Sequence, residues 1–176
     1  VNNECKELLL LLRPGDDSPE IPSAMSQPIV CINFANQEIQ RFDFTRESEQ
    51  ATECSYTHEI GTYLYEPNAS ILKAGAFRSI ASSFHLSKLH ANSHLYTSNE
   101  RIEKFPGRIF RITGYSGLNK KELKNILNGL DKANITTRNF PQSVAELRKR
   151  LKLTDGGDIY LFATTLNDER KIIIRC

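Results

Sequence analysis

The stretch RNFPQSVAELRKRLKLTDGGDIYLFATT, residues 138–165, decides the fold because it holds a helix start, a turn and a strand in succession. Ser143 is followed three residues later by Glu146, which is the capping-box pattern, and Pro141 prevents an earlier helix start. The apolar residues of this helix are spaced i, i+3 and i+7 and form one buried stripe, made up of Val144, Leu147 and Leu151. The DGGD turn at 155–158 then leads into DIYLFATT, which is typical of a buried strand.

The same alternation of strand and helix continues on both sides of this stretch. Strands are predicted at RIFRITGYS, ANITTRNF, DIYLFATT and RKIIIRC, and a second helix at NKKELKNIL, capped by Asn119. LNDERK gives the last two strands a short hairpin turn. The order β-α-β-α-β-β predicts a compact α/β unit with a mostly buried sheet.

The first half of the chain predicts a different unit. PIVCINF and EIQRFDF form a β-hairpin, Thr45 caps a short acidic helix through Cys54, and GTYLYEP is a strand. Asn68 then caps the helix ASILKAGAFRSIASSFHL, which Gly75 can break, and His94–Thr97 form a short strand. PGDDSPEIPS reads as a loop, whereas ECKELLLLLR suits either a helix or a doubly covered strand.

Composition predicts a soluble globular protein. Apolar residues make up 39% of the 176 positions, and the longest apolar run, Leu8–Leu12, is too short to span a membrane. Nothing at the N-terminus resembles a signal peptide. Because the chain starts at Val1 and its only methionine is Met25, we expect a processed or engineered piece of a longer protein. Its few cysteines predict a cytoplasmic location. No CxxC pair occurs, and reduced thiols are expected at Cys5, Cys31, Cys54 and Cys176.

Charge divides the chain into two parts. Residues 1–100 hold 7 basic against 13 acidic residues, whereas residues 101–176 hold 16 against 8. The second part therefore favours an anionic partner, although basic residues can also simply solvate an exposed surface. We place the domain boundary near Ser98–Phe105, in the polar link SNERIEKFPG.

Motifs that carry catalysis are missing from the sequence, which holds no GxGxxG, GxxxxGK[ST] or GxSxG pattern. GYSGLNKK at 114–121 can bind a phosphate at a helix start, but its glycines are more often ordinary turn residues. His85, His90 and His94 have a spacing open to a metal, with Glu100 just beyond, yet no HExxH motif or carboxylate second shell accompanies them, so no metal site is predicted. His58 beside Glu59 reads as a surface pair.

Three blocks of the sequence resemble one family of bacterial proteins. AELRKRLKLTDGGDIYLFATTLNDERKIIIRC resembles the THUMP-like domain that closes a family of class I S-adenosylmethionine-dependent methyltransferases of the Bacteroidetes type. YLYEPNASILKAGAFRSIASSF is similar to their central block, and NECKELLLLLRPG to the end of their methyltransferase domain. The resemblance implies a methyltransferase end or linker at 1–24, a ferredoxin-like domain with a helical connection at 25–102, and a THUMP-like domain at 103–176.

The resemblance also sets expectations for function. S-adenosylmethionine and the catalytic residues would belong to an upstream domain of the parent protein, so this region alone is expected to hold no cofactor, metal or catalytic residue. THUMP domains are associated with structured RNA, so tRNA or rRNA is the expected partner, with no DNA and no membrane. The residues expected to contact phosphates are Lys120, Lys121, Lys124, Arg138, Arg148, Lys149 and Arg150, helped by Lys73 and Arg78.

A second reading gives the region a scaffold role. The helix within EPNASILKAGAFRSI would pack against the methyltransferase domain or another protein, without RNA contact, and its apolar positions would then be partly exposed here.

Overall fold

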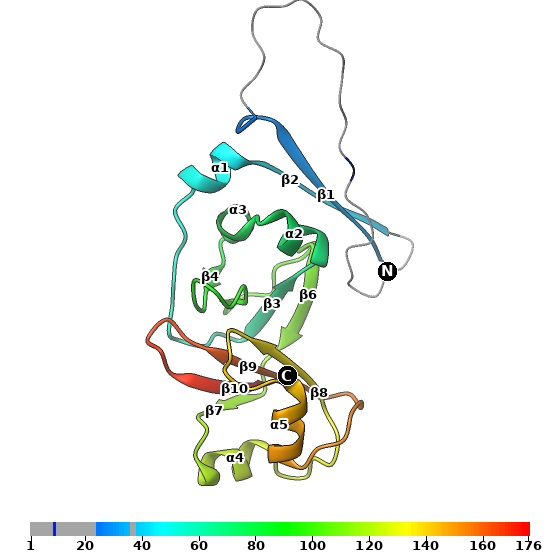
Figure 1. Ribbon diagram of the computed structural model, residues 1–176, viewed down its shortest axis with the longest axis vertical. Helices are drawn as coiled ribbons and strands as arrows, with labels where there is room; N and C mark the ends of the chain where they lie inside the picture. Colours follow the sequence, from blue (N-terminus) through cyan, green and yellow to red (C-terminus); the bar gives the residue numbers. More distant parts are fainter. Residues whose placement is uncertain (1–8, 10–23, 36–37) are drawn as a thin grey trace, which may run out of the picture.

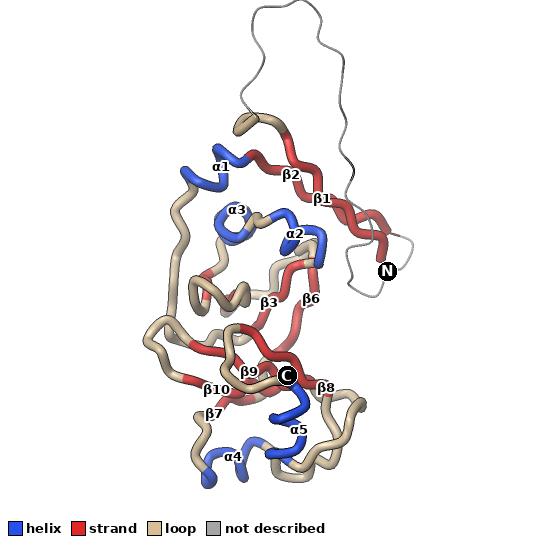
Figure 2. Tube along the Cα trace, in the orientation of Figure 1, coloured by secondary structure: helices blue, strands red, loops and turns tan. Residues whose placement is uncertain are grey.

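The chain forms three separate sheets in the computed structural model, which describes residues 9, 24–35 and 38–176 (Figures 1 and 2). The predictions for ECKELLLLLR (except Leu9) and PGDDSPEIPS lie outside these residues. The mixed α/β class is confirmed, because helices alternate with mostly antiparallel strands over most of the described chain. No helix within the described part is both long and apolar enough to cross a membrane.

A hairpin and a short helix come first. β1 (Pro28–Ala35) pairs with β2 (Glu38–Thr45), and α1 (Arg46–Ala51) follows directly, as predicted. Thr45 caps α1 in a capping box with Ser48, but the helix ends at Ala51 and not at Cys54. The carboxylate of Glu49 on α1 accepts the amides of Phe77, Arg78 and Ser79 at 2.8–2.9 Å, and so links α1 to the start of a later helix.

The second sheet has the strand order β4-β5-β3-β6. Its strands are β3 (Tyr63–Pro67), β4 (Ser87–Lys88), β5 (Tyr96–Ser98) and β6 (Gly107–Arg111). Between β3 and β4 lie α2 (Ala69–Ala74) and α3 (Phe77–Ser83), separated by Gly75 at φ 82°, a left-handed conformation that glycine adopts without strain. The long helix predicted there is thus two helices. β5 starts at Tyr96 and not at His94, because His94 lies at φ 53°, outside the extended region.

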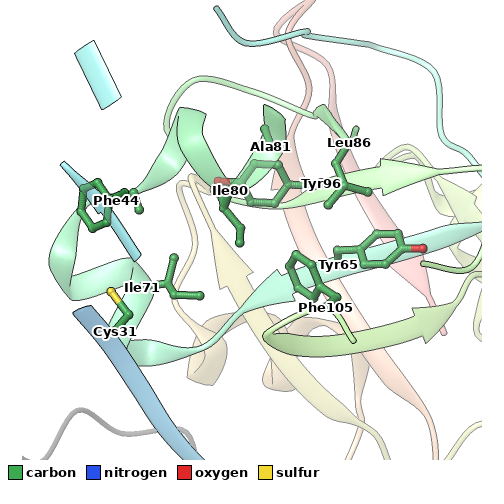
Figure 3. Close-up of a cluster of buried hydrophobic side chains, with 10 residues drawn as sticks. Cys31, Phe44, Tyr65, Ile71, Ile80, Ala81, Leu86, Tyr96 and Phe105 are labelled. Atoms are coloured by element: carbon green, nitrogen blue, oxygen red, sulfur yellow. The ribbon is translucent and has the colours of Figure 1, made fainter. Parts of the chain in front are cut away.

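The core of this unit lies between the sheet and α2 and α3. Tyr65 and Tyr96 are directly paired across β3 and β5, are fully buried, and pack with Ile71, Ile80 and neighbouring residues (Figure 3). The hairpin contributes Cys31 and Phe44 to the same cluster. The apolar positions of the EPNASILKAGAFRSI segment are therefore divided: Ile71 and Ile80 are 1% and 0% exposed, whereas Leu72 and Phe77 are partly exposed, as the scaffold reading expects.

The third sheet has the order β7-β10-β9-β8. It follows the predicted sequence of elements: β7 (Gly114–Ser116), α4 (Lys120–Ile126), β8 (Asn134–Arg138), α5 (Val144–Leu151), β9 (Tyr160–Thr165) and β10 (Lys171–Arg175). β8 runs parallel to β9, and the other pairs are antiparallel. The order β-α-β-α-β-β is confirmed for β7 to β10.

The strand predicted at RIFRITGYS is two strands in different sheets. The amide of Ile112 donates to Thr62 O at 2.9 Å, whereas the amide of Thr113 donates to Arg175 O at 2.8 Å. The chain therefore passes from the second sheet to the third between these two residues. A continuous run of strand-forming residues cannot show such an exchange of partners.

The two four-stranded sheets pack face to face between two layers of helices (Figure 1). Leu64, on β3, faces the third sheet and packs with Phe162 and Ile174, all of which are 0% exposed. The other face of the third sheet carries α4 and α5 through Leu123 and Leu147, together with Ile135 and Leu161. The layers are thus α2/α3, second sheet, third sheet and α4/α5.

Candidate nucleic-acid interface

The α5 helix forms where its sequence predicts. Ser143 Oγ accepts the amide of Glu146 at 3.3 Å, and the Glu146 carboxylate accepts the Ser143 amide at 2.7 Å, which completes the capping box. These hydrogen bonds lower the pKa of Glu146, because they favour its charged form. Leu147 is fully buried in the core under α5. The opposite, solvent-facing side of the helix therefore carries its basic residues.

Two of the three basic residues in the last turn of α5 are engaged by the protein itself. Arg148 pairs with Asp155 at 2.6 Å and also donates to Ala133 O, so it joins the helix to the DGGD turn. Arg150 donates to Gln142 Oε1 at 2.9 Å and to Leu118 O at 3.2 Å. Lys149 is exposed and has no side-chain partner among the described residues. Of these three side chains, Lys149 is therefore the one most available to bind an anion from outside the protein.

The α4 helix carries three further exposed lysines. Asn119 caps it by accepting the amide of Glu122 at 2.9 Å, and Lys120, Lys121 and Lys124 follow. None of these lysine side chains makes a hydrogen bond or ion pair within the described chain. Glu122 turns back and accepts the Gly117 amide at 2.7 Å, so this amide of the GYSGLNKK turn already has a partner. The reading of this turn as structural is therefore favoured over a phosphate site.

Both helices lie on the same face of the third sheet. Leu123 of α4 and Leu147 of α5 belong to one buried cluster, and the two helices form one outer layer of the protein (Figure 1). The exposed lysines of both helices therefore belong to this layer. Beside α5 lies an open depression of about 660 Å³ with apolar and cationic walls. It is lined by Val144, Ala145, Arg148, Lys149, Lys152, Leu153 and Thr154. We call the outer surface of α4 and α5 that carries Lys120, Lys121, Lys124 and Lys149 the lysine face.

Arg138 is not part of the lysine face. It points to the opposite side of the third sheet, where its Nη2 lies 2.7 Å from Oε1 of Glu66 on β3. Glu66 is fully buried and also pairs with Arg108, its cross-strand neighbour on β6, through its other carboxylate oxygen. The Arg108 guanidinium lies over the rings of Phe110 and Tyr160, 5.2 and 5.7 Å from their centroids. We call Glu66, Arg108 and Arg138 the seam cluster, because it joins the two sheets.

Lys73 and Arg78 are also separated from the lysine face. They lie on α2 and α3, the helical layer on the far side of both sheets (Figure 2). Arg78 Nη1 donates to Gln50 O at 3.5 Å. The structure therefore brings together the predicted residues of α4 and α5 but places Arg138, Lys73 and Arg78 elsewhere.

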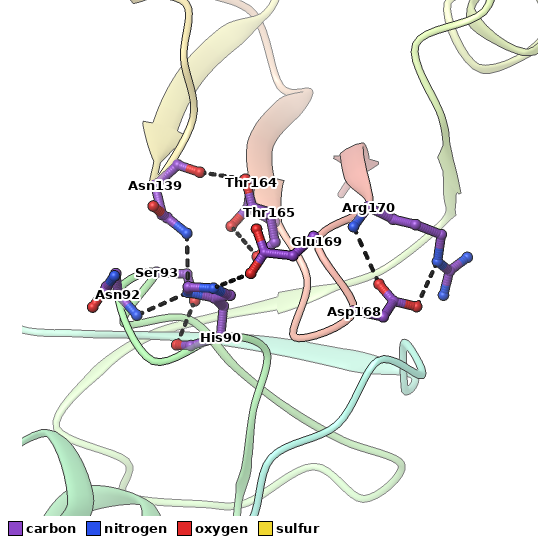
Figure 4. A network of polar contacts seen from close by, with 9 residues as sticks. All are labelled: His90, Asn92, Ser93, Asn139, Thr164, Thr165, Asp168, Glu169 and Arg170. Carbon is purple, nitrogen blue, oxygen red and sulfur yellow. Dashed lines mark hydrogen bonds and ion pairs between the residues drawn. The ribbon is translucent and has the colours of Figure 1, made fainter.

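His90, the middle one of the three clustered histidines, has structural partners. His90 Nδ1 accepts the Asn92 amide at 3.0 Å, which leaves Nε2 to face Glu169 at 3.2 Å (Figure 4). Asn139 also contacts His90 Nδ1, so this network joins the loop after β4 to loops of the third sheet. No group of three or more potential metal ligands occurs within the described residues.

His94 lies in a cationic and largely apolar environment. Its ring stacks on Phe77 with centroids 3.7 Å apart, and its Nδ1 is buried without a hydrogen-bond partner. Burial, and then the positive charges of Lys88 and Arg138, lower the pKa of His94 to about 4. The ring is therefore neutral at neutral pH.

Sequence reasoning missed Glu66 and Glu49. A charged residue inside the apolar run YLYEP signals a buried carboxylate that needs partners, but it does not show which cations supply them. Arg138 is 72 positions away and becomes a partner only when the two sheets pack. Glu49 carried no such signal, because it lies in an acidic segment that reads as exposed.

Comparisons with known proteins place a domain boundary just before β6, whereas the chain passes from the second sheet to the third only between Ile112 and Thr113. A ferredoxin-like domain family matches residues 63–106, and the THUMP domain-like family matches residues 107–176. The chain therefore contains a ferredoxin-like and a THUMP-like domain. The hairpin and α1 lie outside both matches. The lysine face lies entirely in the THUMP-like domain.

One solved structure is similar across most of the chain. It is the crystal structure of a proposed methyltransferase from Porphyromonas gingivalis W83, with 40% sequence identity and a TM-score of 0.80. The match covers 86% of this chain but only 38% of that protein's chain. A comparison with curated proteins finds no match.

Proposed function

We propose that this chain is a non-catalytic, RNA-binding region of a larger S-adenosylmethionine-dependent RNA methyltransferase. The lysine face of the THUMP-like domain would hold structured RNA, tRNA or rRNA, and present it to a catalytic domain elsewhere in the parent protein. The methyl donor would be bound by that domain. The observation that carries the proposal is the set of unpaired lysines gathered on one side of a THUMP-like fold.

The chemistry of the lysine face suits a phosphate backbone more than base edges. Its ammonium groups are point charges without competing carboxylate partners, so they can each neutralise a phosphate. Large exposed aromatic side chains in the described THUMP-like domain are limited to Tyr115, which gives little surface for base stacking. Recognition by backbone contacts and by shape follows from this composition.

Salt dependence and charge reversal test the proposal. Four phosphate contacts give a slope of about −3 in log affinity against log salt concentration. The double variant Lys124→Glu, Lys149→Glu should bind tRNA at least about 10-fold more weakly at about 0.1 M salt and reduce that slope. The matched control Lys104→Glu, Lys171→Glu has the same charge change at two exposed positions outside α4 and α5.

Fluorescence anisotropy with labelled tRNA and rRNA hairpins measures both quantities. Equal weakening in the two double variants would show a nonspecific effect of net charge, and binding without salt dependence would overturn the proposal. Adding Lys73→Glu and Arg78→Glu in a separate variant shows whether the α2/α3 layer contributes, as its residues were expected to do.

The scaffold role is the second candidate. The observation that favours it is an exposed apolar surface on the hairpin, not the α2 and α3 helices on which the sequence placed it.

A further inference from the structure

One face of the β1–β2 hairpin is apolar and uncovered. Val30, Ile32 and Phe34 on β1 are 43%, 46% and 68% exposed, and Ile39, directly opposite Phe34 on β2, is 66% exposed. These four side chains are half of the large apolar side chains that are exposed within the described residues. We call them the hairpin face.

The sequence of β1 is that of a strand covered on both sides. Ile29 and Cys31 point the other way, into the cluster beneath α2, so apolar residues occupy both faces of the strand. A strand with one solvated face normally alternates apolar with polar residues. The outward positions of β2 do become polar beyond Ile39, where Arg41 and Asp43 form an ion pair at 2.6 Å. The apolar side chains therefore form a row along β1, with the charged pair beside it on β2, and an apolar strip next to polar residues is the composition of a docking surface.

The size of the hairpin face indicates what covers it. Two separate proteins need roughly 20–30 residues on each side for a stable interface, far more than this face offers. A domain in the same polypeptide has an effective concentration on the order of millimolar, so a much smaller contact holds it. More than half of the P. gingivalis protein has no counterpart in this chain, so such a domain exists in at least one similar protein.

We propose that the hairpin face is the docking surface for the catalytic domain of the parent protein. This inference rests on the proposed function only in assuming that the chain belongs to a longer methyltransferase. The hairpin lies at one end of the layered structure and the lysine face at the other (Figure 1). A domain docked on the hairpin leaves the lysine face open to RNA.

Thiol labelling of the full-length parent protein tests the docking. Phe34→Cys is compared with Ser83→Cys, an exposed position on α3, and labelling at each site is followed by peptide mass spectrometry. We expect Cys at position 34 to react at least about 10-fold more slowly, which corresponds to a covered face in roughly nine molecules of ten. Ile39→Cys is the second probe if Phe34→Cys does not fold.

The outcomes distinguish a domain of the same chain from a second copy of the protein as the partner that covers the hairpin face. Slow labelling that is independent of protein concentration supports a domain of the same chain. Slow labelling that disappears on dilution assigns the face to a second copy and overturns the proposal, as does equal labelling at positions 34 and 83. RNA binding by the lysine face is measured separately, so either proposal can fail without the other.

Discussion

Replacing Arg138 tests whether the seam cluster holds the two domains together. In Arg138→Met the fully buried Glu66 carboxylate loses two hydrogen bonds, from Nε at 3.2 Å and Nη2 at 2.7 Å, and keeps Arg108 as its remaining partner. Removing the whole partner of a buried charge costs about 3–5 kcal/mol. In this variant Arg108 remains as a cationic partner of Glu66, and the Arg108 and Arg138 side chains are each only about one-third exposed. We therefore expect the free energy of unfolding to fall by about 2–3 kcal/mol.

Urea unfolding of the 176-residue chain measures this loss, with the slope of the transition compared between variants. Arg111→Met is the matched control, because Arg111 is exposed and has no side-chain partner in the described chain; it should change stability by less than about 0.5 kcal/mol. The triple replacement Glu66→Leu, Arg108→Met, Arg138→Met should recover most of the loss, since no orphaned carboxylate remains. If Arg138→Met costs no more than Arg111→Met, the reasoning is wrong.

Two further perturbations concern the partly buried polar residues His94 and Glu49. The lowered pKa of His94 means that the unfolded chain binds this proton more readily, so stability should fall as the pH falls from about 6.5 to about 4. His94→Asn keeps a residue that tolerates positive φ and should flatten that fall in urea titrations; an unchanged pH profile would contradict it. Glu49→Ala removes the acceptor of three α3 amides and should cost about 1–2 kcal/mol in thermal unfolding, whereas Glu47→Ala, also in the first turn of α1, should cost less.

Local signals in the sequence predicted the elements well but not their partners. The capping boxes at Ser143 and Thr45 act within four residues, so the sequence alone indicates where α5 and α1 begin. The division of RIFRITGYS between two sheets depends on the carbonyls of Thr62 and Arg175, which lie far away in the chain. Helix ends and turns are local, whereas the choice of sheet is a property of the packed domains.

The candidate site shows the same difference between local and long-range information. That α4 and α5 share one face agrees with the two βα connections in one sheet, which the predicted order β-α-β-α-β-β already contains. That Arg138 points away from it depends on its alternation along β8, because Ile135 faces the helices and Arg138 the opposite side. In the sequence, an arginine just before a basic helix looks like part of the same basic patch. The alternation of side chains along β8 shows that Arg138 lies on the other side of the sheet from that helix.

This separation decides how RNA-binding data on the chain are to be interpreted. Arg138 binds Glu66 across the two four-stranded sheets, so we expect its replacement to disturb the packing of one sheet on the other. Weaker RNA binding by an Arg138 variant would therefore not identify Arg138 as a phosphate contact. Arg148 raises the same difficulty, because it holds Asp155 in the turn before β9. Lys124 and Lys149 have no such internal partners in the described structure, so a change in affinity after their replacement reports on the interface itself.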